Sequence, residues 1–175
     1  PVWGGGMWNQ GGDDDEVVVT DCVFENNSSH SGSGMYNECN TTVTRCEFKN
    51  NTVGHQNGKG AGMSNLFCSP IVSDCVFENN SLPGDISGSG GGMYNSGSNP
   101  IVTNCVFANN SVYLSGGGMT NRVNSTPTLI DCTFENNSAQ YGGGMWNDEG
   151  SLPTVIDTTV CGNLPDQIWG DYTDG

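Results

Sequence analysis

Apolar and polar residues alternate in this chain over stretches of only three or four positions, and the same stretch returns at a nearly constant interval. All six methionines lie in one motif, Gly-Met-x-Asn, at Met7, Met35, Met63, Met93, Met119 and Met145. The spacings between them are 28, 28, 30, 26 and 26 residues. A period of this length predicts a solenoid in which each repeat stacks on the next.

A second motif, Val/Leu-x-x-Cys-x-Phe-x-x-Asn, alternates with the first. Its five Cys-x-Phe pairs are Cys22/Phe24, Cys46/Phe48, Cys75/Phe77, Cys105/Phe107 and Cys132/Phe134. The sixth copy reads Thr158-Thr159-Val160 and still ends on Asn163. A degenerate last copy is typical of the terminal unit of a repeat array.

Turn-forming Asn, Ser, Gly and Pro bound each short apolar segment, which indicates strands separated by tight bends. Such strands bury a face only by stacking about 4.8 Å apart on the strands of neighbouring coils. We therefore predict an all-β parallel β-helix of about six coils over residues 1–163, with three short strands per coil and no substantial helix. Residues 164–175 are expected to form a cap or a junction to the next coil or subunit.

The Val/Leu, Cys, Phe and Met positions are predicted to point inward as columns of like residues. The second asparagine of each Asn-Asn pair recurs where the chain must bend, and Asn tolerates left-handed backbone geometry. Stacked inward, these amides can also bond to one another as a ladder. The predicted ladder comprises Asn27, Asn51, Asn80, Asn110, Asn137 and Asn163. A second is expected at Asn9, Asn37, Asn65, Asn95, Asn121 and Asn147.

The repeats resemble the Phe-x-x-Asn and Gly-Gly-Ala repeats of chlamydial polymorphic outer-membrane proteins and of related bacterial surface proteins, with Gly-Met in place of Gly-Ala. The resemblance covers nearly the whole chain. It implies a right-handed parallel β-helix of the pectate-lyase-like class, in proteins that are mostly adhesins or surface structures, with enzymes as a minority.

Two cysteines lie outside the Cys-x-Phe motif in turns that we expect to be equivalent on neighbouring coils. Cys39 follows Met35 by four residues and Cys68 follows Met63 by five, so a Cys39–Cys68 disulfide is predicted, with two free turn thiols as the alternative. The five motif cysteines are expected to pack inward. Cys161 should point outward, with a partner in another molecule or in further sequence.

Charge excludes several classes of partner. The chain has 19 acidic and 4 basic residues and a net charge of -15, which disfavours nucleic acid and anionic membrane surfaces. No apolar stretch approaches the roughly 18 residues of a membrane span, and Pro1-Val2-Trp3 is not a secretory leader. We expect a mature or excised segment that is extracellular or on the cell surface.

Arg45 and Lys49 are expected to be sandwiched between acidic residues of neighbouring coils. Asp131 and Asp157 lack such a cation, which makes them weak candidates for binding a metal ion, with Ca²⁺ as the expected cofactor. At residues 13–16, a run of four acids, a solvated loop is the preferred interpretation, since the oxygen spacing matches no calcium loop.

The sequence assembles no catalytic centre. Lys59, Arg122, His30 and His55 remain as isolated loop residues, although the two histidines lie on consecutive coils and could be close together. A solvated pair is favoured over a catalytic couple.

A binding surface is instead predicted between Met and Asn, where aromatic residues point outward beside a glycine column. The residues of this expected face are Trp8, Tyr36, Tyr94, Trp146, Gly34 and Gly92. Aromatic rings stack on sugars or on neighbouring subunits. Ordinary β-propensity and strand packing explain the same pattern equally well.

Seven Asn-x-Ser/Thr sequons are possible glycosylation sites: Asn26, Asn40, Asn50, Asn79, Asn109, Asn124 and Asn136. Glycans stacked at about 4.8 Å would crowd one another, so turn chemistry explains much of the pattern.

The sequence favours a non-catalytic structural or adhesive surface module. Its expected partners are other copies stacked head to tail in a filament, or adjacent coils of a longer chain, and a polysaccharide. A carbohydrate-active enzyme or a polysaccharide-binding module on the same fold is the alternative.

Overall fold

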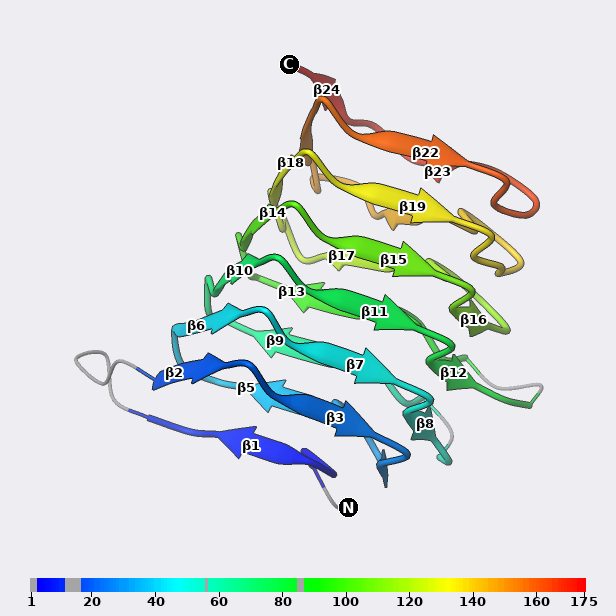
Figure 1. The fold of residues 1–175 in the computed structure, drawn as a ribbon. Helices are drawn as coiled ribbons and strands as arrows, with labels where there is room; N and C mark the ends of the chain where they lie inside the picture. The colour runs from blue at the N-terminus through cyan, green and yellow to red at the C-terminus, as the bar shows by residue number, and fades with distance from the viewer. Residues whose placement is uncertain (1–2, 12–16, 56, 85–86) are drawn as a thin grey trace.

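The computed structural model describes residues 3–11, 17–55, 57–84 and 87–175, and all regular structure in them is β. The chain winds as a solenoid whose coils lie one above the other from the N-terminus to the C-terminus (Figure 1). Every strand pairs in parallel with its equivalent one coil away. The prediction of a parallel β-helix of about six coils is therefore confirmed.

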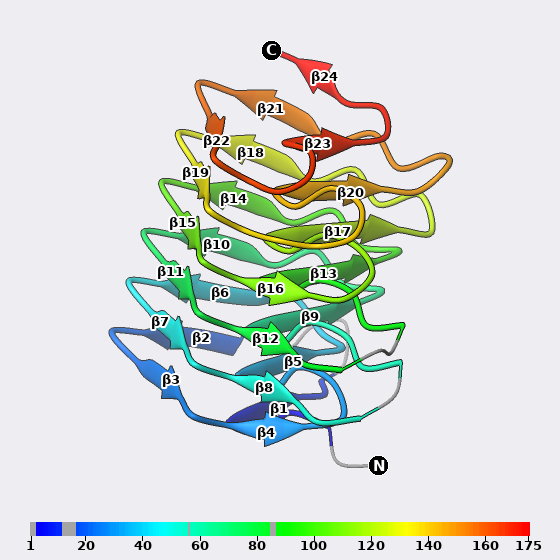
Figure 2. The same ribbon diagram turned by 90° about the vertical axis from the view of Figure 1, so that its right-hand side faces the viewer.

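Two sheets of seven strands run the length of the solenoid (Figure 2). The methionine sheet contains β1 (Met7–Asn9), β5 (Met35–Asn37), β9 (Met63–Leu66), β13 (Met93–Ser96), β17 (Met119–Arg122), β20 (Met145–Asn147) and β23 (Ile168–Trp169). The valine sheet contains β2 (Val17–Thr20), β6 (Thr41–Thr44), β10 (Ile71–Ser73), β14 (Ile101–Thr103), β18 (Thr128–Ile130), β21 (Thr154–Ile156) and β24 (Thr173–Asp174).

The phenylalanine sheet has six strands: β3 (Val23–Glu25), β7 (Glu47–Lys49), β11 (Val76–Glu78), β15 (Val106–Ala108), β19 (Thr133–Glu135) and β22 (Thr159–Cys161). A fourth sheet consists of two-residue strands: β4 (Ser28–Ser29), β8 (Thr52–Val53), β12 (Ser81–Leu82) and β16 (Ser111–Val112). Three strands per coil were expected. Four coils have this extra strand because the residues after each Asn-Asn pair also stay in register across coils.

Like residues stack on like residues through the core. Met63 pairs with Met93 in register, and the Phe77 and Phe107 rings lie parallel. Successive phenylalanine rings are 4.5–4.9 Å apart and within 5° of parallel. Four of the five motif cysteines are buried in the same core, whereas Cys22, in the first coil, is exposed because no coil lies below it.

The predicted asparagine column forms a continuous hydrogen-bonded ladder. Asn80 Nδ2 donates to Asn110 Oδ1 at 3.0 Å and to the Phe48 carbonyl at 2.8 Å, while its Oδ1 accepts from the Asn51 amide and side chain. The amide-to-amide bond recurs at every step from Asn27 to Asn163, and the bond to a phenylalanine carbonyl recurs from Asn51 onward. Because each buried side-chain amide is hydrogen-bonded on both sides, the ladder replaces the hydrogen bonds to water and leaves no amide in it without a partner.

The second ladder runs along the methionine sheet from Asn9 to Asn147, with Nδ2–Oδ1 distances of 2.7–2.9 Å. It ends where Asn147 donates to the Asp171 carbonyl. The first ladder ends differently. Gln167 Oε1 accepts from both Asn163 nitrogens, so a glutamine takes the place of the next asparagine.

The bends place left-handed backbone one residue earlier than predicted. It is the first asparagine of each pair that has φ of 54–56°, at Asn26, Asn50, Asn79, Asn109 and Asn136. Gly162, with φ of 65°, occupies the equivalent position in the last coil. The second asparagine has ordinary backbone geometry and is used for the ladder instead.

Residues 164–175 continue the solenoid as a shortened turn, in which β23 pairs with β20 and β24 with β21. Lys49 lies in register between Glu25 and Glu78 of the neighbouring coils, as expected, although its direct ion pair is with Glu47 of its own strand at 2.8 Å. Arg45 contacts Asp21 of the preceding coil at 2.7 Å. The acidic run 13–16 lies outside the described residues. No helix capable of crossing a membrane occurs in the described part of the chain.

The predicted Cys39–Cys68 disulfide is wrong: all eight cysteines lie in the described residues, and all are free. Cys68 Sγ donates to the Asn37 carbonyl at 3.4 Å, and Cys39 Sγ lies 4.0 Å from Thr41 Oγ1. One extra residue between the ladder asparagine and the cysteine in the second turn offsets the two thiols. Each thiol therefore bonds to a polar group of the turns instead of to the other sulfur.

Asn80→Ala should destabilise the fold strongly, because it removes four side-chain hydrogen bonds and leaves buried partners unmet. We expect a loss of roughly 2–4 kcal/mol in the free energy of unfolding, measured by chemical denaturation. Asn79→Gly is the matched control: Asn79 is exposed with φ of 54°, so the change should stay within about 0.5 kcal/mol. Equal losses in the two variants would contradict the ladder's role.

Thiol labelling of the native protein should modify Cys22 and Cys161 rapidly and the six buried cysteines only after unfolding. Burial raises the pKa of both Cys46 and Cys68 to about 11, so these thiols stay protonated and unreactive at neutral pH. Mass spectrometry after labelling with and without denaturant gives the count. A native count of two, with all eight after unfolding, is expected; a pair that resists labelling until reduced would restore the disulfide.

Candidate functional site

The outer face of the methionine sheet carries a column of side chains between each inward Met and inward Asn. The column comprises Trp8, Tyr36, Ser64, Tyr94, Thr120 and Trp146, all in register. It continues in the last turn at Trp169, where Ile168 takes the place of the methionine. Because strand residues alternate in direction, the inward Met and Asn force these residues outward. An aromatic column on one face of the solenoid is thus a consequence of the repeat.

A second column of residues runs beside this face and forms one wall of a groove. It consists of Trp3, Ser31, Lys59, Ser89, Ser115 and Tyr141, which are joined by isolated parallel bridges. Each is followed by a glycine with φ of 57–72°. At Gly60 a side chain would overlap the Met63 carbonyl, so glycine is required for the chain to turn from the wall into the strand.

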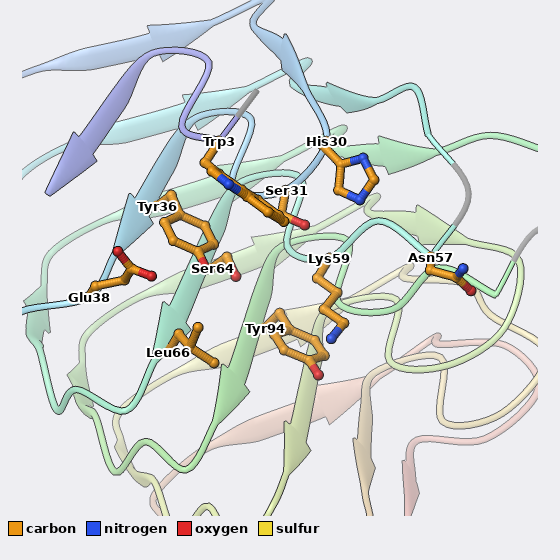
Figure 3. Close-up of a pocket in the computed structure, with 10 residues that line it drawn as sticks. All are labelled: Trp3, His30, Ser31, Tyr36, Glu38, Asn57, Lys59, Ser64, Leu66 and Tyr94. Atoms are coloured by element: carbon orange, nitrogen blue, oxygen red, sulfur yellow. The ribbon is translucent and has the colours of Figure 1, made fainter. Parts of the chain in front are cut away.

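Two adjoining cavities occupy the groove. The first has a volume of about 510 Å³ and is lined by Trp3, His30, Ser31, Tyr36, Glu38, Asn57, Lys59, Ser64, Leu66 and Tyr94 (Figure 3). The second, of about 540 Å³, is lined by Asn57, Lys59, Ser87, Ser89, Leu114, Ser115, Arg122, Tyr141, Trp146 and Trp169. Both share Asn57 and Lys59, so the groove follows the solenoid axis across most of the coils.

Cations lie over aromatic rings at two places in the groove. Lys59 Nζ is 5.1 Å from the centre of the Tyr94 ring, and the Arg122 guanidinium is 5.7 Å from the centre of the Trp146 ring. Arg122 also approaches Asp148, at 3.7 Å. The contacts hold both basic side chains along the groove, in a chain whose net charge is -15.

The aromatic residues expected to form an exposed face are present on it but differ in access. Trp8 is 48% exposed and Trp146 is half-buried, whereas Tyr36 and Tyr94 are only 6% and 3% exposed. Trp3 packs over Tyr36 at 5.4 Å, and burial raises the pKa of Tyr36 to about 12. The tryptophans therefore offer the accessible ring faces.

The prediction that Gly34 and Gly92 belong to the outward binding face is wrong. Gly34 and Gly92 are buried, and a Cβ added to them would lie 2.9 Å from the Phe48 ring and 2.8 Å from the Phe107 ring. Both glycines therefore face the core, where only hydrogen leaves room for the stacked phenylalanines. The bend that precedes each Met sets this direction, and strand alternation alone did not reveal it.

Three groove residues, Trp3, Tyr141 and Trp169, were missed by the sequence analysis, and Lys59 was treated as an isolated loop residue. A signal was available, because every wall residue precedes a motif methionine by four positions. Trp169 could have been found from its offset to Trp146, since Ile168 takes the methionine position in the last turn.

His30 lines the first cavity together with Trp3, and His55 lies against His30. Their ring centres are 4.5 Å apart, and Trp3 packs edge-on against His30 at 5.1 Å. Burial, and then the neighbouring His55, lower the pKa of His30. The two histidines that the sequence placed on consecutive coils are thus brought together.

The remaining predicted sites are on other surfaces. The sequon asparagines Asn26, Asn40, Asn50, Asn79, Asn109, Asn124 and Asn136 are all exposed. Asp131 and Asp157 are exposed at left-handed bends, with φ of 52° and 46°. Within the described ranges, no three His, Cys, Asp or Glu side chains gather as a metal-binding group.

Comparison with known proteins gives one result. The model of a family described as a right-handed β-helix region matches residues 4–169. No curated protein and no solved structure matches the chain. The match spans all the coils and fixes the hand of the solenoid as right-handed, so this chain belongs to the right-handed β-helix family.

Proposed function

We propose that the chain is a non-catalytic extracellular module with a structural or adhesive role, and that its groove binds a polysaccharide. The observation that carries the proposal is the pair of adjoining cavities, which together line one face of the solenoid with aromatic, hydroxyl and amide groups. Such a lining suits a ligand with both apolar ring faces and many hydroxyls.

The periodicity of the groove favours an extended ligand lying along the axis. Tyr36, Tyr94 and Trp146 occur on every second coil, a spacing of about 9.6 Å at roughly 4.8 Å per coil. Two sugar rings of an extended chain cover a similar length. A polymer could therefore meet the small exposed parts of Tyr36 and Tyr94 and the accessible ring of Trp146 at equal intervals, with Asn57, Ser64 and other polar residues as hydrogen-bond partners.

The small number of carboxyl groups in the groove favours binding over catalysis. Glycoside hydrolysis uses two carboxyl groups that flank the scissile bond. Among the described residues that line the two cavities, Glu38 is the single carboxylate, and Asp148 lies beside Arg122 next to them. The arrangement supplies positioning groups more readily than an acid and base pair.

The proposed extracellular location rests on two arguments. The repeats resemble those of chlamydial and related bacterial surface proteins, and the net charge of -15 suits a soluble surface exposed to solvent. A disulfide would have been a third argument for an extracellular location, but all the cysteines are free thiols. Glycans on the exposed sequon asparagines are part of the same proposal, and intact-mass measurement of the natively produced protein detects them.

Calorimetric titration with neutral and acidic oligosaccharides tests the groove. Trp146→Ala should weaken binding by roughly tenfold, equivalent to about 1.4 kcal/mol, since it removes an accessible ring face. Tyr113→Ala is the control, because Tyr113 is an exposed aromatic residue outside both cavity linings. Binding to no oligosaccharide, or equal loss in both variants, would sink the proposal. Newly formed sugar ends after incubation would show an enzyme instead.

Assembly is a second proposal, carried by the two ends of the described coils. β3 is an open edge with Val23 60% exposed, and a hollow of about 590 Å³ at the other end is lined by Val155, Val160 and Ile168 among others. Open parallel edges accept another strand, either from a second copy or from further residues of the same chain.

Light scattering should show elongated species that grow with protein concentration if second copies stack end to end. Val23→Pro, on the open edge of β3, should shift the population to monomer while circular dichroism stays unchanged. A monomer at every concentration would rule out assembly and leave the groove proposal intact.

A further inference from the structure

A cluster of three rings stands at the N-terminal end of the groove, apart from the aromatic column. His30 follows β4 and His55 follows β8, and these strands pair in register, so the chain leaves both at the same corner of the solenoid. The imidazole centres of His30 and His55 are 4.5 Å apart. Trp3 packs edge-on against His30, and Figure 3 shows these two residues on the same side of the cavity. The chain has only two histidines, and the fold brings them into contact.

His30 Nδ1 is an exception in a structure that pairs its buried polar atoms thoroughly. Among the described residues it is the one buried side-chain nitrogen or oxygen without a hydrogen-bond partner. Unpaired buried polar atoms are rare in folded proteins and call for an explanation such as a bound ion. The unpaired atom belongs to a metal-ligating side chain whose neighbour is another such side chain.

We propose that His30 and His55 together bind a divalent transition-metal ion of the imidazole-preferring class, Ni²⁺, Cu²⁺ or Zn²⁺. Metal–nitrogen bonds of about 2.0–2.1 Å allow two imidazole nitrogens on one ion to lie up to about 4 Å apart. Rings whose centres are 4.5 Å apart, with a 43° tilt, reach this range by small side-chain rotations. His55 is exposed, so the ion enters from solvent, and water completes its coordination.

The surrounding charges set the properties of the site. Lys59 faces the pair and opposes a cation locally, while the net charge of -15 attracts one over a longer range. The lowered pKa of His30 keeps its imidazole neutral, the form that ligates metal, at neutral pH. Nitrogen ligands favour transition metals over Ca²⁺ and Mg²⁺, which prefer oxygen. His30 lines the first cavity, so the metal site adjoins the groove, but the metal proposal does not depend on polysaccharide binding.

Proton NMR with Ni²⁺ tests this directly, because the full chain has two imidazole side chains and each gives one resolved ring Hε1 signal. The background should carry Cys22→Ser and Cys161→Ser, to remove the exposed thiols, and excess Mg²⁺, to occupy acidic oxygen sites. Substoichiometric Ni²⁺ should broaden both imidazole signals together, and calorimetry should give one ion per chain.

His30→Asn and His55→Asn should each weaken Ni²⁺ binding by more than about tenfold, since either change leaves one ligand. Trp3→Phe is the matched control: it keeps an aromatic ring against His30 and should retain the affinity. Unchanged affinity in either histidine variant, or broadening of only one imidazole signal, would overturn the proposal. Retained oligosaccharide binding in both histidine variants would confirm that the two sites are separate.

Discussion

A hydrogen bond between identical side chains one coil apart is the interaction on which this structure depends. Each ladder asparagine accepts from the coil before it and donates to the coil after it, so a shift of one residue would break every step at once. The stacked phenylalanines require the same register, because their rings overlap only when like lies on like. Polar and apolar columns therefore enforce a single alignment of the coils.

The same register creates the groove. Once Met and Asn point inward on each strand of the methionine sheet, the residue between them faces outward at the same height on each coil. The glycine after each wall residue has a left-handed backbone conformation, which turns the chain sharply into the strand and leaves the wall residue beside the sheet. Residues at these two positions are free of core packing, so they can vary between Ser, Thr, Lys, Tyr and Trp and serve recognition.

The four basic residues fall into two pairs, one held by acidic side chains and one located in the groove. Arg45 and Lys49 are paired with Asp21 and Glu47 on the valine and phenylalanine sides. Lys59 and Arg122, the other two basic residues, lie over aromatic rings in the groove. A chain of net charge -15 thus presents its less strongly paired cations at the face where its cavities and its accessible tryptophans also lie.

The sequence alone determined the solenoid, the stacking of Met, Phe and Asn, and the outward direction of Tyr36 and Trp146, because a fixed period and the two-residue alternation of strands settle these features. Tertiary structure alone decided that Gly34 faces the core, that Trp3 covers Tyr36, and that Cys39 and Cys68 stay apart. These outcomes depend on the bends between strands. There, a change of one residue or one left-handed φ redirects a side chain while the period stays the same.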